Sequence, residues 1–223
     1  MRKSELAKMI DHTLLGPTAS SKGVAELCRE AKKYGFASVV VNPCHVNLAR
    51  DLLKETAVKV CTVIGFPHGT STSEVKAFEA QKAIASGAEE LDMVINVAAL
   101  KEGDYVTVLE DIKAVCAAAQ KAPGPILVKV ILEMALLEEA EKVAGAILAK
   151  AGGADFVKTS TGFGPDGATV EDVELLHQTV GEKVGVKAAG GIRDYETALA
   201  MIEAGATRIG ASRSVSILEG APE

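Results

Sequence analysis

Two lysines lie in short β-rich runs of the sequence, where a charged side chain is unusual. Lys158 ends the run "DFVK" just before the segment "TSTG", and Lys187 lies in "VGVKAAG", 29 residues later. Lysine is almost never fully buried without a partner or a chemical task. One such lysine would be explained by a strand cap or by pairing with a core carboxylate. Two at matching positions of consecutive strands favour a common site.

Two ammonium groups at one site would change each other's acidity. At about 4 Å and an effective dielectric constant of about 20 they repel by roughly 4 kcal/mol, enough to lower one pKa by up to three units from about 10.4. One amine would then be neutral near pH 7 and could attack a carbonyl carbon to form an imine, while its charged neighbour stabilises negative charge. The lysine pair therefore predicts imine chemistry.

Three further ionisable groups lie at the ends of β-rich runs, Asp92 in "ELDMVIN" and both Lys129 and Glu133 in "KVILE". The alternation of a strand places Asp92 with Val94 on one face and Lys158 with Phe156 on one face. A charge flanked by apolar neighbours in this way is expected to point into the interior of the fold. Asp92 is therefore a candidate carboxylate for the lysine site, and Lys129 a candidate supporting cation.

The segment "DHTLL" near the N-terminus contains weaker candidates. If the β-rich runs form a barrel, Asp11 and Thr13, which end the first run, could reach its mouth, although a helix-capping or turn role is equally compatible with the sequence. The four histidines have no metal-ligand spacing, and they are His12, His45, His68 and His177. We therefore assign the histidines no chemistry and expect neither a metal nor another cofactor.

Glycines follow three consecutive β-rich runs and predict an anion site. They occur in "TG", "GG" and "GAS", and the last two follow the final pair of runs. Loops in these places often hold a phosphate on backbone N–H groups beside a short helix, although such glycines can also serve only as tight turns. The predicted phosphate-binding residues are Gly162, Gly190, Gly191, Gly210, Ser212 and Arg213.

The elements that must position these residues alternate along the whole chain. Eight β-rich runs span residues 9–14, 37–42, 58–65, 90–96, 125–133, 155–160, 184–190 and 207–212. Between most of them, apolar residues recur at helical spacing. A glycine followed by a small or apolar residue also recurs before four of the runs, at Gly35, Gly87, Gly153 and Gly205, with separations of 52, 66 and 52 residues. A βα unit of about 26 residues explains most of this spacing.

Eight such units predict a (β/α)8 TIM barrel with a short N-terminal helix, and residues 1–223 are expected to form one catalytic domain. The competing fold is an open doubly wound sheet, which rarely needs eight evenly spaced strands. In a barrel, active sites lie at the C-terminal ends of the strands. Lys158 and Lys187 are at such ends.

The composition limits the class of partner. The chain has 48% hydrophobic and 24% charged residues, a net charge of −6 and no basic cluster, so nucleic acid is not expected as a partner. No apolar run approaches the roughly 18 residues of a membrane span, and no secretory core is visible near the N-terminus. The four cysteines are interpreted as reduced, mostly buried thiols. A cytoplasmic location without a membrane partner is expected.

The assembled motifs resemble the deoxyribose-phosphate aldolases, class I aldolases of the barrel type. The resemblance covers nearly the whole length, with "DHTLL", "VNP", "GFPHG", "ELDMVIN", "KVILE", "FVKTSTGF", "GVKAAGGIR" and "RIGAS" in the order found in that family. It implies reversible, metal-independent cleavage of 2-deoxy-D-ribose 5-phosphate to D-glyceraldehyde 3-phosphate and acetaldehyde. It also implies that Lys158 forms the imine, Lys187 is its cationic neighbour, and Asp92 is the carboxylate of a proton relay.

Two departures from the family pattern bear on these roles. Some members have a lysine directly after the "TSTG" glycine where this chain has Phe163, so Arg213 is expected to supply part of the phosphate's charge neutralisation. Some members end in a tyrosine where this chain reads "LEGAPE", so the last proton step is expected to depend on Asp92, Lys187 and water.

Two alternatives to an aldolase share parts of this pattern. A phosphate-binding barrel isomerase or synthase would need the glycines but no obligatory imine, and a ligand-binding regulatory barrel would need no catalysis. Borohydride reduction with substrate separates them, because only an imine gives a permanent adduct. The expected partner is a small phosphorylated sugar, and a homo-oligomer, dimer or tetramer, is the default assembly.

Overall fold

The structure, a computed structural model, describes residues 1–223 and has eight parallel strands in a closed barrel. Each strand pairs with its neighbours in chain order, and β1 closes the ring against β8. The strands are β1 (Ile10–Leu14), β2 (Ser38–Val41), β3 (Lys59–Ile64), β4 (Glu90–Val94), β5 (Leu127–Ile131), β6 (Phe156–Lys158), β7 (Gly185–Ala189) and β8 (Arg208–Ala211). The predicted barrel is confirmed, and all eight β-rich runs contain a strand.

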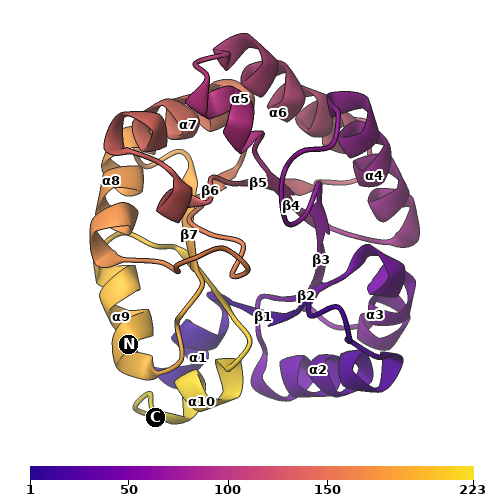
Figure 1. Ribbon diagram of the computed structural model, residues 1–223. Helices are drawn as coiled ribbons and strands as arrows, with labels where there is room; N and C mark the ends of the chain where they lie inside the picture. Colours follow the sequence, from indigo (N-terminus) through magenta and orange to yellow (C-terminus); the bar gives the residue numbers. More distant parts are fainter.

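Helices surround the ring of strands (Figure 1). They are α1 (Lys3–Ala7), α2 (Ser21–Tyr34), α3 (Val46–Leu53), α4 (Ser73–Ser86), α5 (Val97–Lys101), α6 (Tyr105–Gln120), α7 (Glu139–Ala151), α8 (Val170–Val180), α9 (Tyr195–Glu203) and α10 (Ser214–Glu219), with 3₁₀ turns η1 (Pro43–His45) and η2 (Met134–Leu136). The predicted short N-terminal helix is α1. The two termini lie side by side, where the amide of Lys3 donates to the carbonyl of Pro222 at 3.0 Å.

The repeated glycine joints have the backbone conformation that the sequence suggested. Gly35 ends α2 at φ 69° and Gly87 ends α4 at φ 108°, in the left-handed region that residues with a Cβ avoid. Both turn the chain from the end of a helix directly into the next strand. None of the helices has the length and apolar character that crossing a lipid bilayer requires.

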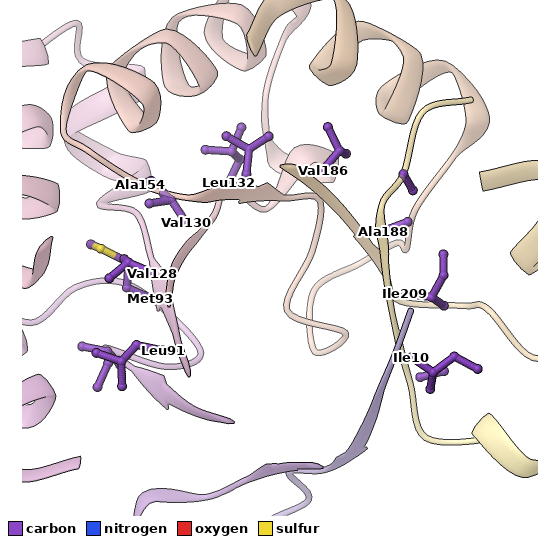
Figure 2. Packing of buried hydrophobic residues seen from close by; sticks show 14 of the residues in the cluster. Ile10, Leu91, Met93, Val128, Val130, Leu132, Ala154, Val186, Ala188 and Ile209 are labelled. Atoms are coloured by element: carbon purple, nitrogen blue, oxygen red, sulfur yellow. The ribbon is translucent and has the colours of Figure 1, made fainter. Parts of the chain in front are cut away.

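The apolar core lies between the strands and the helices. Figure 2 shows Leu91, Val130 and Val186 on the outer side of the strand ring, directed toward the helices. These three side chains are fully buried and belong to one cluster of 55 core residues. Because successive strand residues point to opposite faces, the residues between them face the inside of the barrel. Those inner residues form the site described next.

Candidate active site

The inside of the barrel holds charged side chains, whereas the interiors of such barrels are usually packed with branched apolar ones. They come from β1, β4, β5, β6, β7 and β8, and all are buried except the half-buried Arg208. The interior charges are Asp11, Glu90, Asp92, Lys129, Lys158, Lys187 and Arg208. The alternation that predicted an inward Asp92 and Lys158 therefore holds for the whole set.

The two lysines singled out in the sequence are neighbours across β6 and β7, where Lys158 pairs with Lys187 in the strand register. Both ammonium groups contact Oδ2 of Asp92, Lys158 Nζ at 2.9 Å and Lys187 Nζ at 2.7 Å. One carboxylate oxygen thus joins the two amines. The structure brings together all three residues to which the resemblance assigns catalysis.

Lys129 occupies the other side of the same carboxylate. Its Nζ lies 2.8 Å from Oδ1 of Asp92 and 2.7 Å from Oε2 of Glu90. The thiol of Cys61 on β3 also donates to Oδ1 of Asp92, at 3.3 Å. These contacts fix the plane of the Asp92 carboxylate, so that Oδ2 faces Lys158 and Lys187.

Asp11 and Thr13 have separate places, although the sequence placed both near the barrel mouth. Thr13 lines the cavity at the mouth. Asp11 lies deeper and is fully buried, where it forms an ion pair with Lys187, lies 2.7 Å from Arg208 Nη1 and accepts a hydrogen bond of 2.6 Å from Ser38. Asp11 is therefore a partner of the interior lysine and not a group at the mouth.

The interior amines differ in how many carboxylates they contact. Lys129 contacts three and Lys187 contacts two, whereas Lys158 contacts Asp92 alone. Burial lowers the pKa of Lys158, and although Asp92 opposes this, repulsion from Lys187 adds to it, so the pKa stays below its usual value. Burial acts on Lys187 too, but Asp11 and Asp92 outweigh it and raise the pKa of Lys187. The fold therefore makes Lys158 the amine that most readily loses its proton.

The direction of this shift agrees with the sequence-based expectation, but its main cause differs. Repulsion between Lys158 and Lys187 was expected to dominate, whereas burial is the larger effect. The pKa of Asp92 is held well below its usual value, because Lys129, Lys158 and Lys187 together outweigh the effect of burial on the carboxylate. Asp92 is accordingly ionised in the resting protein and available to accept a proton.

A cavity of about 340 Å³ opens at the C-terminal ends of the strands, and Lys158 lies at its inner end. All six residues predicted to bind phosphate line this cavity: Gly162, Gly190, Gly191, Gly210, Ser212 and Arg213. Asp92 and Lys187 are fully buried below it. Of the three residues expected to be catalytic, only Lys158 is presented directly to a ligand in the cavity.

Two features of the cavity were not assigned from the sequence. Arg193, two residues after the "GG" pair, is a second cation in the cavity wall in addition to Arg213. Phe163, which stands where some family members have lysine, packs edge to face against Phe66 with ring centroids 5.4 Å apart. Phe66 belongs to the "GFPHG" segment, one of the motifs that carry the family resemblance.

Glu133 follows β5 and holds the loop after β6. It is buried and has a left-handed backbone, with φ 58° and ψ 60°. Its carboxylate accepts the backbone N–H of Thr161 at 3.3 Å and also the Thr161 hydroxyl. The hydroxyl oxygen in turn accepts the N–H of Phe163 at 3.0 Å. Glu133 thereby fixes the turn that carries Gly162.

The residues missed in the sequence follow the same alternation as those found. Glu90 lies two positions before Asp92, and Arg208 lies two positions before Gly210, so both share the inward face of their strands. That spacing was a usable signal. No group of three or more His, Cys, Asp and Glu side chains is arranged to hold a metal ion.

Comparison with known proteins gives one consistent result. Residues 6–220 match the model of the DeoC/LacD family aldolases. A deoxyribose-phosphate aldolase of Thermoanaerobacter sp. (strain X514) is 60% identical over 214 residues, which are 96% of each chain. Another of Clostridium perfringens (strain 13 / Type A) is 59% identical over 220 residues, 99% of this chain and 97% of the relative.

Solved structures agree with the sequence relatives. The tetrameric deoxyribose phosphate aldolase from Aeropyrum pernix superposes with a TM-score of 0.91 at 37% identity, covering 97% of this chain and 91% of the other. A structure described as QR15, an aldolase, superposes with a TM-score of 0.90 at 43% identity, covering 96% of this chain and 94% of the other.

Proposed function

The chain belongs to the deoxyribose-phosphate aldolases of the DeoC/LacD family, and from this premise we propose that it works through a Schiff base on Lys158. The reaction is the reversible cleavage of 2-deoxy-D-ribose 5-phosphate to D-glyceraldehyde 3-phosphate and acetaldehyde. The observation that carries the proposal is the placement of Lys158, which alone among the amines inside the barrel contacts a single carboxylate and lines the cavity.

The first step is attack on the open-chain sugar. Neutral Lys158 Nζ adds to the C1 aldehyde to give a carbinolamine, and the carbinolamine hydroxyl then takes up a proton from solvent and leaves as water, which gives a protonated imine. Lys187 stays charged because Asp11 and Asp92 stabilise its ammonium group. Its charge favours the neutral form of Lys158 before attack.

The second step breaks the C2–C3 bond. The electron pair of that bond moves into the imine to give an enamine, while the C3 hydroxyl loses its proton and becomes the aldehyde of D-glyceraldehyde 3-phosphate. We propose that the proton passes through Lys187 or a water molecule to Asp92, which is ionised in the resting state. The same relay returns a proton to C2 of the enamine, and hydrolysis of the resulting imine releases acetaldehyde.

The phosphate is proposed to bind at the glycine loops beyond β6, β7 and β8. Gly162, Gly190 and Gly191 have positive φ angles of 83°, 93° and 78°, which turn these loops around the cavity. Arg193 and Arg213 supply positive charge at the same wall, where Phe163 supplies none. Backbone N–H groups and two guanidinium groups form a suitable site for a phosphate dianion.

Reductive trapping tests the imine directly. Incubation with acetaldehyde and borohydride should add the mass of one ethyl group, and peptide mapping should place it on Lys158. Mapping of the adduct to Lys187 or Lys129 would reverse the assignment. Absence of any adduct, with cleavage intact, would remove the Schiff base from the mechanism.

Substitution in the last loop tests the phosphate site. Ser212→Asp places a like charge against the ligand, so the KM for 2-deoxyribose 5-phosphate should rise far more than the KM for unphosphorylated deoxyribose. Ser216→Asp on α10, outside the cavity, is a matched control that adds the same charge. Equal effects of Ser212→Asp on both substrates would mean that the phosphate binds elsewhere.

A homo-oligomer, a dimer or tetramer, is proposed from the outer surface. Val75 and Phe78 on α4 and Tyr105 and Val106 on α6 are large apolar side chains that are exposed on neighbouring helices. Monomers rarely leave large contiguous apolar patches in water. The relative from Aeropyrum pernix is tetrameric. Light scattering should show that Phe78→Asp lowers the assembly mass, whereas Ile147→Asp on α7 leaves it unchanged.

The remaining proposals concern the setting of the enzyme. Residues 1–223 are proposed to act as one catalytic domain, in the cytoplasm, on a small phosphorylated sugar and without a nucleic-acid or membrane partner. The free state of all four cysteines and the net charge of −6 support this setting. Cell fractionation followed by an assay of acetaldehyde release would test the location.

A further inference from the structure

We infer that Arg208 and Glu90 are positioning residues for Lys158, because their charges decide which amine inside the barrel is neutral. They are the first residues of β8 and β4, at the N-terminal end of the strands, which we call the floor of the barrel. Neither residue lines the cavity at the barrel mouth, and neither contacts Lys158. They act on Lys158 indirectly, first through Asp11, Lys129 and Lys187 and then through Asp92. The inference rests on the proposed role of Lys158 as the imine-forming amine.

The floor is linked to the lysine site by shared carboxylates. Arg208 Nη1 lies 2.9 Å from Glu90 Oε2 and 2.7 Å from Asp11 Oδ1. Glu90 Oε2 also contacts Lys129 Nζ at 2.7 Å, and Asp11 forms an ion pair with Lys187. Glu90 therefore divides its charge between Arg208 and Lys129, and Asp11 divides its charge between Arg208, Lys187 and, at 3.8 Å, Lys129.

Lys129 and Lys187 connect the floor carboxylates to Asp92. Both contact Asp92, Lys129 at Oδ1 and Lys187 at Oδ2. Asp92 Oδ2 is also the one carboxylate oxygen that Lys158 contacts. A change in the charge of Arg208 or Glu90 therefore alters how strongly Lys129 and Lys187 attract the Asp92 carboxylate. It thereby alters how strongly Asp92 stabilises the ammonium form of Lys158.

The count of charges gives the direction of the effect. Four basic side chains face three carboxylates inside the barrel, so the interior carries one surplus positive charge when every group is ionised. An uncompensated buried charge is costly, and the guanidinium of Arg208 does not lose its proton. One lysine must therefore lose its proton to balance the interior, and Lys158 has the fewest carboxylate partners.

The remaining inward groups do not change this balance. β2 contributes Ser38, whose hydroxyl donates to Asp11 Oδ1 at 2.6 Å. β3 contributes Cys61, and burial raises the pKa of its thiol, which keeps it neutral. The titratable groups that act on the pKa of Lys158 are Asp92, Lys187 and Cys61.

Substitutions that change the net charge inside the barrel in opposite directions provide the test. Arg208→Met removes a positive charge, which leaves carboxylate charge free to hold Lys158 as an ammonium ion. Glu90→Gln removes a negative charge, which favours loss of the Lys158 proton. The rate of borohydride trapping with acetaldehyde, measured against pH, should shift its midpoint upward by about one pH unit in Arg208→Met and downward by a similar amount in Glu90→Gln.

Two further variants separate charge from structure. Arg208→Met combined with Glu90→Gln restores the balance, and its midpoint should return close to that of the wild type. Arg208→Lys keeps the charge while losing the guanidinium geometry, and its midpoint should also remain close to that of the wild type. If Arg208→Met does not fold, the double variant compared with Glu90→Gln isolates the same charge, and the double variant should have the higher midpoint by about one pH unit.

The outcomes distinguish a failure of the role inferred for Arg208 and Glu90 from a failure of the Schiff-base mechanism. Midpoints that move in the same direction in both single variants, or that stay fixed while only the amount of folded protein falls, would overturn the inference. A failure of the underlying mechanism would look different, because the wild type itself would then give no adduct on Lys158.

Discussion

The two faces of the eight strands have opposite chemistry, although consecutive residues build them. Leu91, Met93, Val130 and Val186 face the helices and are fully buried among apolar neighbours (Figure 2). The residues between them, such as Asp92, face inward and form ion pairs. The outer face is a continuous apolar core, and the inner face is a layered set of charges.

This difference indicates that stability and catalysis are divided between the two faces. Apolar burial contributes roughly 25 cal/mol for each Å² removed from water, so the outer face is expected to supply most of the folding free energy. Buried ion pairs contribute little net stability, because desolvation offsets their attraction. The inner charges are therefore best explained by what they do to the pKa of Lys158. A shift of one residue in strand register would exchange the two faces and turn the charged side chains toward the helices. The charged site can therefore form only in the correctly folded barrel.

Lys158→Ala is expected to give the largest effect, a loss of activity without a loss of stability. It removes the proposed nucleophile, so cleavage should fall by about a thousandfold or more, and no borohydride adduct should form. The melting temperature should remain equal to or above that of the wild type, because the three remaining interior cations balance the three carboxylates. Acetaldehyde release, adduct mass and thermal melting measure the three effects. A variant that unfolds would show that the amine is needed for the fold.

Leu91→Ala should produce the reverse pattern. Leu91 is fully buried on the outer face, and its truncation should lower the free energy of unfolding by about 2–5 kcal/mol through lost burial and a cavity. Its neighbour Asp92 keeps its contacts, so kcat at a permissive temperature should change little. Denaturant unfolding and steady-state kinetics check both parts. A large loss of kcat in fully folded Leu91→Ala would contradict the division between the faces.

The outer face and the barrel were predictable from the sequence because they follow from local periodicity. Each strand alternates, each helix repeats its apolar positions, and Gly35 and Gly87 have the left-handed backbone that ends a helix. The lysine pair was also predictable, since Lys158 and Lys187 occupy matching places in consecutive parallel strands.

The interior network was harder to predict because it depends on the closure of the barrel. Arg208 on β8 contacts Asp11 on β1, which lies beside β8 only because the barrel closes, and Glu90 on β4, which lies across the interior. The dominance of burial over repulsion at Lys158 likewise depends on depth, which periodicity does not report. Glu133 lies beyond its strand in a left-handed conformation, where alternation no longer indicates direction.

Lys187→Leu tests how far one inner charge controls another. Loss of the Lys187 ammonium removes its repulsion and leaves Asp92 more available to Lys158, so the pKa of Lys158 should rise. A raised pKa means more protonated amine at pH 7, so imine trapping should slow by about tenfold for each pH unit by which that pKa rises, and recover as the pH increases. Lys187→Arg keeps the charge and should leave the midpoint unchanged. An unaltered pH profile in Lys187→Leu would show that Lys187 does not control the pKa of Lys158 and that burial lowers it without help from that charge.

The smallest effect is expected at Glu133, which lies beyond the C-terminal end of β5 and belongs to neither face. Glu133→Gln keeps the shape of the side chain but removes the charge that accepts the Thr161 N–H and hydroxyl. Hydrogen bonds to charged groups contribute about 1.5–3 kcal/mol, of which the amide oxygen retains a part. The loop that carries Gly162 should therefore loosen, and the KM for 2-deoxyribose 5-phosphate should rise about three- to tenfold, with little change for unphosphorylated deoxyribose.

Glu133→Asn provides the matched variant, because asparagine tolerates the left-handed backbone at this position while its side chain is too short to retain the same contacts with Thr161. It should raise the KM for the phosphorylated substrate at least as much as Glu133→Gln, with a smaller loss of melting temperature than a residue that disfavours this backbone, such as valine. If both variants lower kcat for the two substrates equally and leave KM unchanged, Glu133 supports the interior charges and not the phosphate loop.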